Sequence, residues 1–128
     1  MIDIEKMAKE HEKLFPKATL ESQVWKLEEE LKEFQSTETE QDEMKELADV
    51  LIVCGGLYRW CPLLAKTQAD SVYGTICYID VCVSDFEKEV KRKWKINLKR
   101  KWEWNGKTYH HIKTVEMMSE INRVLGEE

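Results

Sequence analysis

The spacing of apolar and polar residues along the chain predicts a protein built mainly from helices. Over residues 20–35, apolar side chains recur at intervals of three and four and share one helix face. They are Leu20, Val24, Leu27, Leu31 and Phe34. Thr19 suits the N-cap of this helix. A shorter helix is expected over about residues 3–14, because Asp3 suits an N-cap and Pro16 disfavours helical geometry in the residue before it.

A third helix is expected over about residues 43–60. Asp42 is the predicted N-cap, and Pro62 lies just beyond the expected end. Only the polar stretch 36–41 separates this helix from the one before it. So short a connection predicts that the two helices are antiparallel neighbours.

The middle of this third helix is apolar on every side. No charged residue occurs from Val50 to Leu57, and a helix that is apolar all round is buried all round. In a chain of 128 residues, this is more apolar surface than we expect one subunit to cover. The sequence therefore predicts that pairing of subunits completes the core.

The second half of the chain is expected to be helical as well. Residues 66–73 are interpreted as a connection or a helix start, and a long helix is expected over about residues 71–101. The Asn-Gly pair that begins at Asn105 predicts a turn, and residues 114–125 have the pattern of a closing helix. The predicted fold class is all-α, with an antiparallel helical bundle.

Composition narrows the class of protein. The 5 glycines and 2 prolines are too few for an all-β domain, which needs a turn every 8–12 residues or so. Charged residues make up 35% of the chain and hydrophobic residues 42%, which excludes a disordered chain and a membrane protein. The start of the chain lacks the basic and apolar regions of a secretory signal, so we expect a cytoplasmic protein.

The four cysteines indicate no disulfide framework or zinc site. There is no CxxC pair, and no histidine lies at the spacing of a metal site. We expect reduced thiols within the core. The cysteines are Cys54, Cys61, Cys77 and Cys82.

The net charge of −5 conceals an uneven distribution. Residues 1–50 carry 15 acidic and 7 basic residues, whereas residues 88–107 carry 9 basic and 2 acidic residues. An acidic segment together with a basic one suggests a cation site whose anionic ligand reaches the basic part. A basic run by itself is also typical of a nucleic-acid contact or of a solvated helix face.

Two pairs of acidic residues lie at helical spacing on the second and third helices. Glu30 and Glu33 share one flank of the second helix, and Glu46 and Asp49 share a face of the third. Asp49 lies within an apolar run, and burying an unpaired aspartate costs several kcal/mol. Asp49 therefore needs a hydrogen-bonding partner, a neighbouring cation or a metal ion.

If the two helices pack antiparallel, these four carboxylates converge. They would repel one another without a divalent cation between them, and ligation by oxygen alone favours Mg²⁺ or Mn²⁺ over zinc. A di-iron site is excluded because it needs Glu-x-x-His motifs, which the sequence lacks. The alternative for clustered glutamates is a solvated helix face, which is our interpretation of Glu28 and Glu29 taken alone.

A group of polar residues continues the apolar face of the last long helix. Lys93, Asn97 and Arg100 follow one another at helical spacing. Two cations and an amide donor along one face suit a polyphosphate. We interpret the other lysines and arginines of this segment as a solvated face.

Three motifs occur in order along the chain. They are Glu29-Glu30-x-x-Glu33, then Glu46-x-x-Asp49 after twelve intervening residues, and then Lys93-x-x-x-Asn97-x-x-Arg100-x-Trp102. Together they resemble the signature of the MazG-like all-α nucleoside triphosphate pyrophosphohydrolases. The resemblance covers about residues 15–112, so a single MazG-like domain over residues 1–128 is expected to have its core there.

This resemblance implies paired subunits, as a homodimer or homotetramer, and hydrolysis of an NTP or dNTP to the monophosphate and pyrophosphate. It implies that Mg²⁺, or Mn²⁺, is held by Glu30, Glu33, Glu46 and Asp49. It assigns contacts with the triphosphate to Lys93, Asn97 and Arg100.

Other residues enter the predicted site through their positions beside these motifs. Glu29 completes the catalytic motif of the family that the chain resembles. Gln23 and Lys26 lie on the flank of the helix that carries the glutamates, and we take them as candidates for contacts with the nucleotide. His110 and His111 follow the predicted turn and are interpreted as a surface pair, with a phosphate contact as the alternative.

Two other functions stay open at this level. A helical nucleic-acid-binding protein would use residues 88–107, with Trp94, Trp102 and Trp104 as stacking residues, but this leaves Asp49 unexplained. A catalytically silent partner protein is the other alternative, and the complete set of carboxylates argues against it. No membrane partner is expected, because the longest apolar stretch is well short of the roughly 20 residues of a membrane span.

Overall fold

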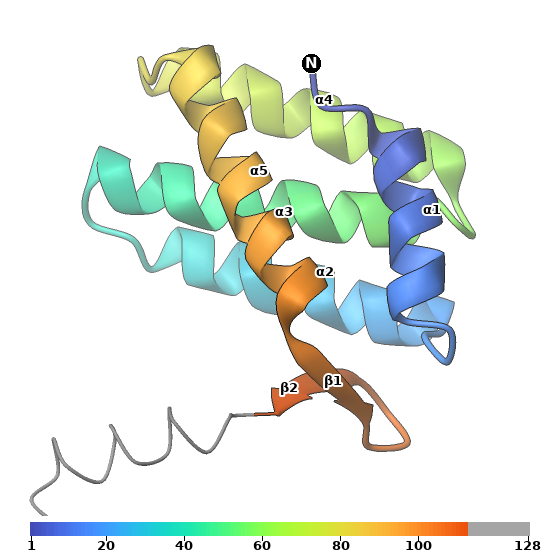
Figure 1. Cartoon of the computed structure of the whole chain (residues 1–128). Coiled ribbons are helices and arrows are strands. Elements are labelled where there is room, and N and C mark those ends of the chain that lie inside the picture. The colour runs from blue at the N-terminus through green and yellow to red at the C-terminus, as the bar shows by residue number, and fades with distance from the viewer. Residues whose placement is uncertain (113–128) are drawn as a thin grey trace, which may run out of the picture.

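The computed structural model describes residues 1–112 and shows a mostly helical chain with a small two-stranded sheet (Figure 1). The elements are α1 (Ile4–Leu14), α2 (Leu20–Gln35), α3 (Glu40–Leu57), α4 (Pro62–Tyr78), α5 (Val83–Lys99), β1 (Lys101–Trp104) and β2 (Tyr109–Ile112). The predicted helical class is confirmed. None of the helices within the described range is long and apolar enough to cross a membrane. The predicted closing helix over residues 114–125 lies outside the described residues.

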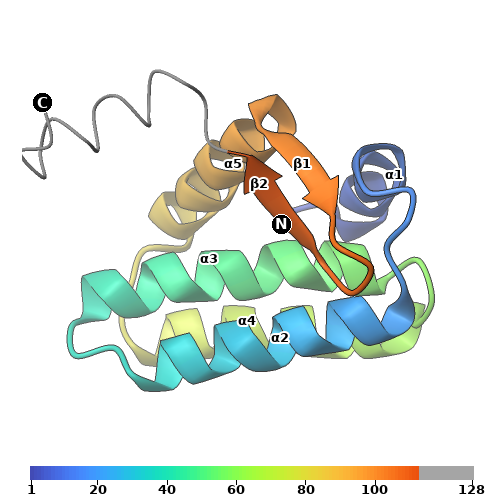
Figure 2. The ribbon, with the colours of Figure 1, turned by 90° about the horizontal axis from the view of Figure 1, so that it is seen from below.

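Helix α3 lies at the centre of the fold. Helices α2 and α4 lie alongside it, whereas α1 and α5 cross it (Figures 1 and 2). All four of these helices pack against α3. Helices α2 and α3 run antiparallel, as the short connection between them predicts. Glu30 and Glu33 of α2 therefore lie beside Glu46 of α3.

Side-chain caps fix the first turns of α1 and α2 where the sequence predicts them. Asp3 accepts a hydrogen bond from the backbone N–H of Lys6 at 3.0 Å. Thr19 Oγ1 accepts from the backbone N–H of Ser22 at 3.0 Å, and Ser22 Oγ accepts from the backbone N–H of Thr19 at 2.9 Å. This reciprocal capping box fixes where α2 begins and thereby which residues lie on each of its faces.

Helix α3 differs from its prediction at both ends. It begins at Glu40 because Thr39, and not Asp42, is the N-cap. Thr39 Oγ1 accepts a hydrogen bond from the backbone N–H of Asp42 at 3.1 Å, so Asp42 lies in the first turn, where a negative charge is favourable. At the other end, the backbone N–H of Trp60 turns back to the carbonyl oxygen of Leu57 at 3.0 Å. The helix therefore ends three residues earlier than predicted.

The apolar stretch of α3 is covered within a single chain. Every residue from Val50 to Leu57 is buried, and Leu51, Cys54 and Leu57 have no exposed surface. The argument that one subunit cannot cover this stretch is wrong, because the four surrounding helices already do so. Subunit pairing stays a prediction without that support.

The predicted long helix over residues 71–101 is wrong, because the chain forms α4 and α5 instead. The predicted connection over residues 66–73 lies inside α4. Pro62 occupies the first turn of α4, where the missing N–H leaves no hydrogen bond unmade. Between the two helices, Asp80 adopts a φ of 60°, a conformation that aspartate tolerates better than most residues and that reverses the chain.

The predicted Asn-Gly turn is confirmed, and it joins two strands that the sequence analysis did not predict. Gly106 has a φ of 92°, which favours glycine. Asn105 Oδ1 accepts hydrogen bonds from the backbone N–H groups of Lys107 at 2.9 Å and Thr108 at 2.8 Å. Strands β1 and β2 pair antiparallel on either side of this turn.

Aromatic contacts hold the hairpin against the end of α1. Phe15, the C-cap of α1, packs with its ring centroid 5.0 Å from the rings of both Trp102 and Tyr109. The hydroxyl oxygen of Tyr109 accepts a hydrogen bond from the backbone N–H of Lys17 at 2.9 Å. The hairpin is therefore attached to the segment that joins α1 and α2.

We expect Phe15→Leu to loosen this attachment and to lower the free energy of unfolding by about 1 kcal/mol, because leucine keeps much of the volume but loses the ring contacts with Trp102, Tyr109 and His11. Limited proteolysis within residues 105–108 measures release of the hairpin, and urea unfolding measures the free energy. Phe34→Leu is the matched control, since Phe34 is half-buried on α2 and takes no part in these ring contacts. Equal cleavage rates in both variants would contradict the anchoring role.

The cysteines are free thiols, as predicted, but only part of the set lies in the core. Cys54 is buried, and burial raises the pKa of its thiol to about 12. The prediction of a core position is wrong for Cys77 and Cys82, which are exposed. These two residues flank the turn between α4 and α5, which the sequence analysis had placed inside one helix.

Candidate functional site

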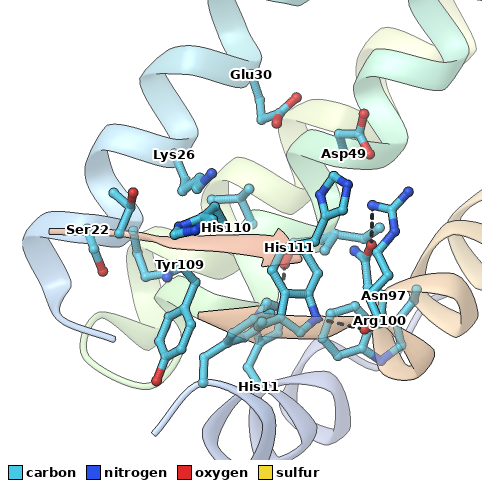
Figure 3. Close-up of a pocket in the computed structure, with 17 residues that line it drawn as sticks. His11, Ser22, Lys26, Glu30, Asp49, Asn97, Arg100, Tyr109, His110 and His111 are labelled. Carbon is cyan, nitrogen blue, oxygen red and sulfur yellow. Dashed lines mark hydrogen bonds between the residues drawn. The ribbon is translucent and has the colours of Figure 1, made fainter. Parts of the chain in front are cut away.

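A pocket with a volume of about 360 Å³ is lined by residues of α1, α2, α3, α5 and the hairpin (Figure 3). This volume falls within the range of roughly 300–1,000 Å³ that is usual for small-molecule sites. Glu30 on α2 and Asp49 on α3 lie at the same end of the pocket (Figure 3). The pocket brings together six residues that the sequence analysis singled out: Gln23, Lys26, Glu30, Asp49, Asn97 and Arg100.

Three glutamates from α2 and α3 converge beside this end of the pocket. Glu30, Glu33 and Glu46 each offer a carboxylate oxygen, and these atoms all lie within 4.8 Å of one another. We call them the glutamate cluster. Glu30 Oε2 and Glu46 Oε2 are enclosed and have no hydrogen-bond partner among the described residues. A buried carboxylate oxygen without a partner is costly, and a cation bound at the cluster would remove that cost.

Burial and mutual repulsion raise pKa values across the glutamate cluster. Burial, with added repulsion from Asp49 and Glu33, raises the pKa of Glu30 from 4.5 to about 8. Burial is also the main cause that raises the pKa of Glu46, and the same two neighbours add to it. A positive charge among these carboxylates would favour their ionised forms and would therefore lower the pKa values of Glu30 and Glu46 again.

Asp49 is paired with a lysine and does not join the glutamate cluster. Lys93 Nζ donates hydrogen bonds to Asp49 Oδ2 and to the carbonyl oxygen of Lys45, both at 2.9 Å. Burial raises the pKa of Asp49, whereas the hydrogen bond and charge of Lys93 lower it. Of the three partners that the sequence left open for Asp49, the structure shows a cation. Lys93 lies outside the lining of the pocket, so its predicted contact with a triphosphate stays a prediction.

We expect Lys93→Met to destabilise the protein, because it leaves the half-buried Asp49 charge unpaired. Without added metal at pH 7, the free energy of unfolding should fall by about 1 kcal/mol, less than for a fully buried pair, since both side chains keep some contact with water. Urea unfolding followed by tryptophan fluorescence measures this change. Lys91→Met, at an exposed position of the same helix, is the control. Equal losses in the two variants would contradict a role for the ion pair.

Glu29 lies outside both the pocket lining and the glutamate cluster. Its side chain is 60% exposed, and its carboxylate lies 3.9 Å from Lys26 Nζ. This placement is typical of a solvated helix face, and its catalytic role stays a prediction. Asn97 and Arg100, in contrast, lie together on one wall of the pocket, with Arg100 Nη1 3.5 Å from Asn97 Oδ1 (Figure 3).

Aromatic and histidine side chains also line the pocket: His11, Phe15, Trp94, Trp102, Tyr109, His110 and His111. Sequence analysis assigned no role at a site to three of them, His11, Phe15 and Tyr109. These lining side chains come from α1, α5 and the hairpin, which are far apart in the sequence. One sequence signal could have found the hairpin residues. Aromatic residues alternate with other residues on both sides of the Asn-Gly turn, and alternate residues of a strand point to the same face.

His11 is a buried and neutral member of this group. Its Nε2 lies 2.9 Å from the carbonyl oxygen of Ile52, so this nitrogen carries a hydrogen and donates it. The imidazole stacks on Trp94 with ring centroids 4.4 Å apart. Burial lowers the pKa of His11 to about 4, so the ring is uncharged at pH 7.

Comparison with known proteins assigns no family to this chain. No protein-family model matches it, and no curated protein or solved structure does so either. Its function therefore has to be inferred from the side chains of the pocket and of the glutamate cluster.

Proposed function

We propose that this protein is a Mg²⁺-dependent nucleoside triphosphate pyrophosphohydrolase, which hydrolyses an NTP or dNTP to the monophosphate and pyrophosphate. The observation that carries the proposal is the pair of enclosed carboxylate oxygens, Glu30 Oε2 and Glu46 Oε2, which lack a hydrogen-bond partner within residues 1–112. They belong to a cluster of three carboxylates beside a pocket that is also lined by cationic side chains. This combination suits a divalent cation with a polyphosphate ligand.

The chemistry of the glutamate cluster fits Mg²⁺. Its three carboxylates offer oxygen atoms alone, which hard divalent cations prefer, and Mn²⁺ shares this preference. Glu30, Glu33 and Glu46 would hold the ion, with the neighbouring Asp49 as the fourth carboxylate that the motif assigns. When bound, Mg²⁺ supplies positive charge that polarises the phosphate and makes a water molecule more acidic.

Residues on the other walls of the pocket suit the triphosphate itself. Lys26, Asn97 and Arg100 line the pocket and can donate hydrogen bonds to phosphate oxygens. The two cations would also offset the negative charge that builds on the departing pyrophosphate, which lowers the barrier to hydrolysis. The reacting α-phosphate would then lie between these donors and the carboxylates.

The three tryptophans that the nucleic-acid-binding alternative would use offer little free ring surface. Trp94 is buried and stacks on His11, and Trp102 packs against Phe15. Trp104 is half-buried and packs on Tyr109. Stacking on the bases of an extended strand needs exposed rings, so we do not advance this alternative as a second proposal.

Hydrolysis assays with a panel of NTPs and dNTPs test the proposed function. We expect pyrophosphate and the nucleoside monophosphate in equal amounts, with turnover only when Mg²⁺ or Mn²⁺ is present. Samples treated with EDTA provide the control. Release of orthophosphate would show that a different bond is cleaved, and no turnover of any nucleotide would favour the catalytically silent partner protein.

A further inference from the structure

Gln23 is a buried polar residue of the pocket whose side chain has no partner. It lines the pocket although only 9% of it is exposed. None of the described residues forms a hydrogen bond with its carboxamide, and neither amide atom is fully enclosed. The amide therefore keeps some accessible surface, and its residue lines both this pocket and a smaller adjoining one beside Gly56. A ligand that pairs with it would recover hydrogen bonds that the protein alone does not make.

Local structure holds the Gln23 side chain at the pocket wall. The capping box of Thr19 and Ser22 fixes the turn of α2 in which Gln23 lies. On the facing helix α3, Gly56 leaves the space that the carboxamide occupies, because a methyl group at Gly56 would overlap Gln23 Oε1. The amide is therefore placed by both helices and needs little rearrangement to meet a ligand.

Flat rings line the same pocket as this amide. The ring of His11 lies close to the same glycine and stacks on Trp94. Trp102 and Tyr109 line the pocket from the hairpin. Flat apolar surfaces around one hydrogen-bonding amide suit a flat ligand with a polar edge.

The distance along α2 separates this part of the pocket from the carboxylates. Gln23 and Glu30 are seven residues apart on α2, which corresponds to about 10 Å along the helix axis. Lys26 lies between them and also lines the pocket. This spacing leaves room for a sugar between a ring bound at Gln23 and a phosphate bound near Glu30.

We propose that the part of the pocket around Gln23 binds the nucleobase of a mononucleotide, and that the Gln23 carboxamide pairs with the edge of that base. This inference rests on the proposed function, which places the phosphates near the carboxylates. A carboxamide presents a donor and an acceptor side by side, so it pairs with a base edge that offers the complementary acceptor and donor. A base held in another orientation leaves the buried amide unpaired, which makes Gln23 a specificity-determining residue.

Binding measurements with Gln23→Met test this inference, because methionine keeps the length of the side chain but has neither amide group. With Mg²⁺ present, calorimetry and tryptophan fluorescence compare α,β-methylene nucleoside triphosphates of each base with inorganic tripolyphosphate. We expect the variant to bind the preferred nucleotide about tenfold or more weakly than the wild type. Its affinity for tripolyphosphate should stay within about twofold, which also shows that the variant is folded. Gln35→Met, exposed at the end of the same helix, should behave like the wild type.

Several results would overturn the inference. One is a wild type that binds tripolyphosphate as tightly as any nucleotide, and another is a variant that keeps the wild-type base preference. Joint loss of tripolyphosphate and nucleotide binding in Gln23→Met would also reject it, as would tighter binding of single-stranded oligonucleotides than of mononucleotides. These measurements need no turnover. Base-dependent binding without hydrolysis would therefore reject the proposed function and leave the role of Gln23 standing.

Discussion

Replacing Glu30 by glutamine is expected to lower kcat for nucleoside triphosphate hydrolysis by about 10³-fold. Glu30 belongs to the glutamate cluster and also lines the pocket, so it would contact both the metal ion and the space for the reacting phosphate. Glutamine has nearly the same shape but no charge, and it is a much weaker ligand for a hard cation. The loss should therefore appear at saturating substrate and persist at high Mg²⁺ concentration.

The same variant should remain folded, which separates this effect from misfolding. In the metal-free protein, burial and repulsion from Asp49 and Glu33 oppose ionisation of Glu30, so the uncharged glutamine should leave the free energy of unfolding unchanged or higher. Glu28→Gln, exposed on the same helix, is the control and should keep wild-type kcat. Full activity of Glu30→Gln at saturating Mg²⁺ would reject the assigned metal site.

The stability of the metal-free protein is expected to fall as the pH rises from about 6.5 to about 8. The folded chain keeps a proton on Glu30, whose pKa is raised from 4.5 to about 8, whereas the unfolded chain loses it. Between these values the native state binds more protons, so stability decreases with increasing pH. His11 acts in the opposite direction below pH 6.5, because its pKa is lowered from 6.5 to about 4. Above pH 6.5 the effect of Glu30 is no longer offset.

One proton over this pH interval changes the free energy of unfolding by at most about 2 kcal/mol, and solvent contact of the half-buried Glu30 reduces the effect to about 1 kcal/mol. Urea unfolding at several pH values in EDTA measures the slope. Glu30→Gln should flatten it, whereas Glu28→Gln should not. Added Mg²⁺ should raise stability most at pH 8, where the carboxylates are ionised. An identical slope in the wild type and Glu30→Gln would contradict the raised pKa.

The parts of the fold that sequence predicts well are those with local signals at both ends. The bounds of α2 follow from the Thr19 cap and from an apolar face that continues to Phe34. The break between α4 and α5 has no such signal, because Ile79, Val81 and Cys82 continue the apolar character of the helix before them. The turn depends on the unusual conformation of Asp80, which composition does not reveal.

In the candidate site, too, some residues could be predicted from local sequence and others could not. The glutamates could be predicted because Glu30 and Glu33 lie one turn apart on one helix, and the antiparallel packing of α2 and α3 brings Glu46 to them. The position of Lys93 beside Asp49 depends on how α5 crosses α3, which helical periodicity does not specify. His11 was missed for the same reason, since its place in the pocket depends on the packing of α1.

Because α3 is central, ligand binding at the glutamate cluster would also stabilise helices that do not contact the ligand. The glutamate cluster joins α2 to α3, and α3 is the helix against which α1, α4 and α5 also pack. A ligand that ties these two helices together therefore protects the helix on which the cooperative unfolding of the whole core depends. Slower amide hydrogen exchange on ion binding would then extend to helices that make no contact with the ion.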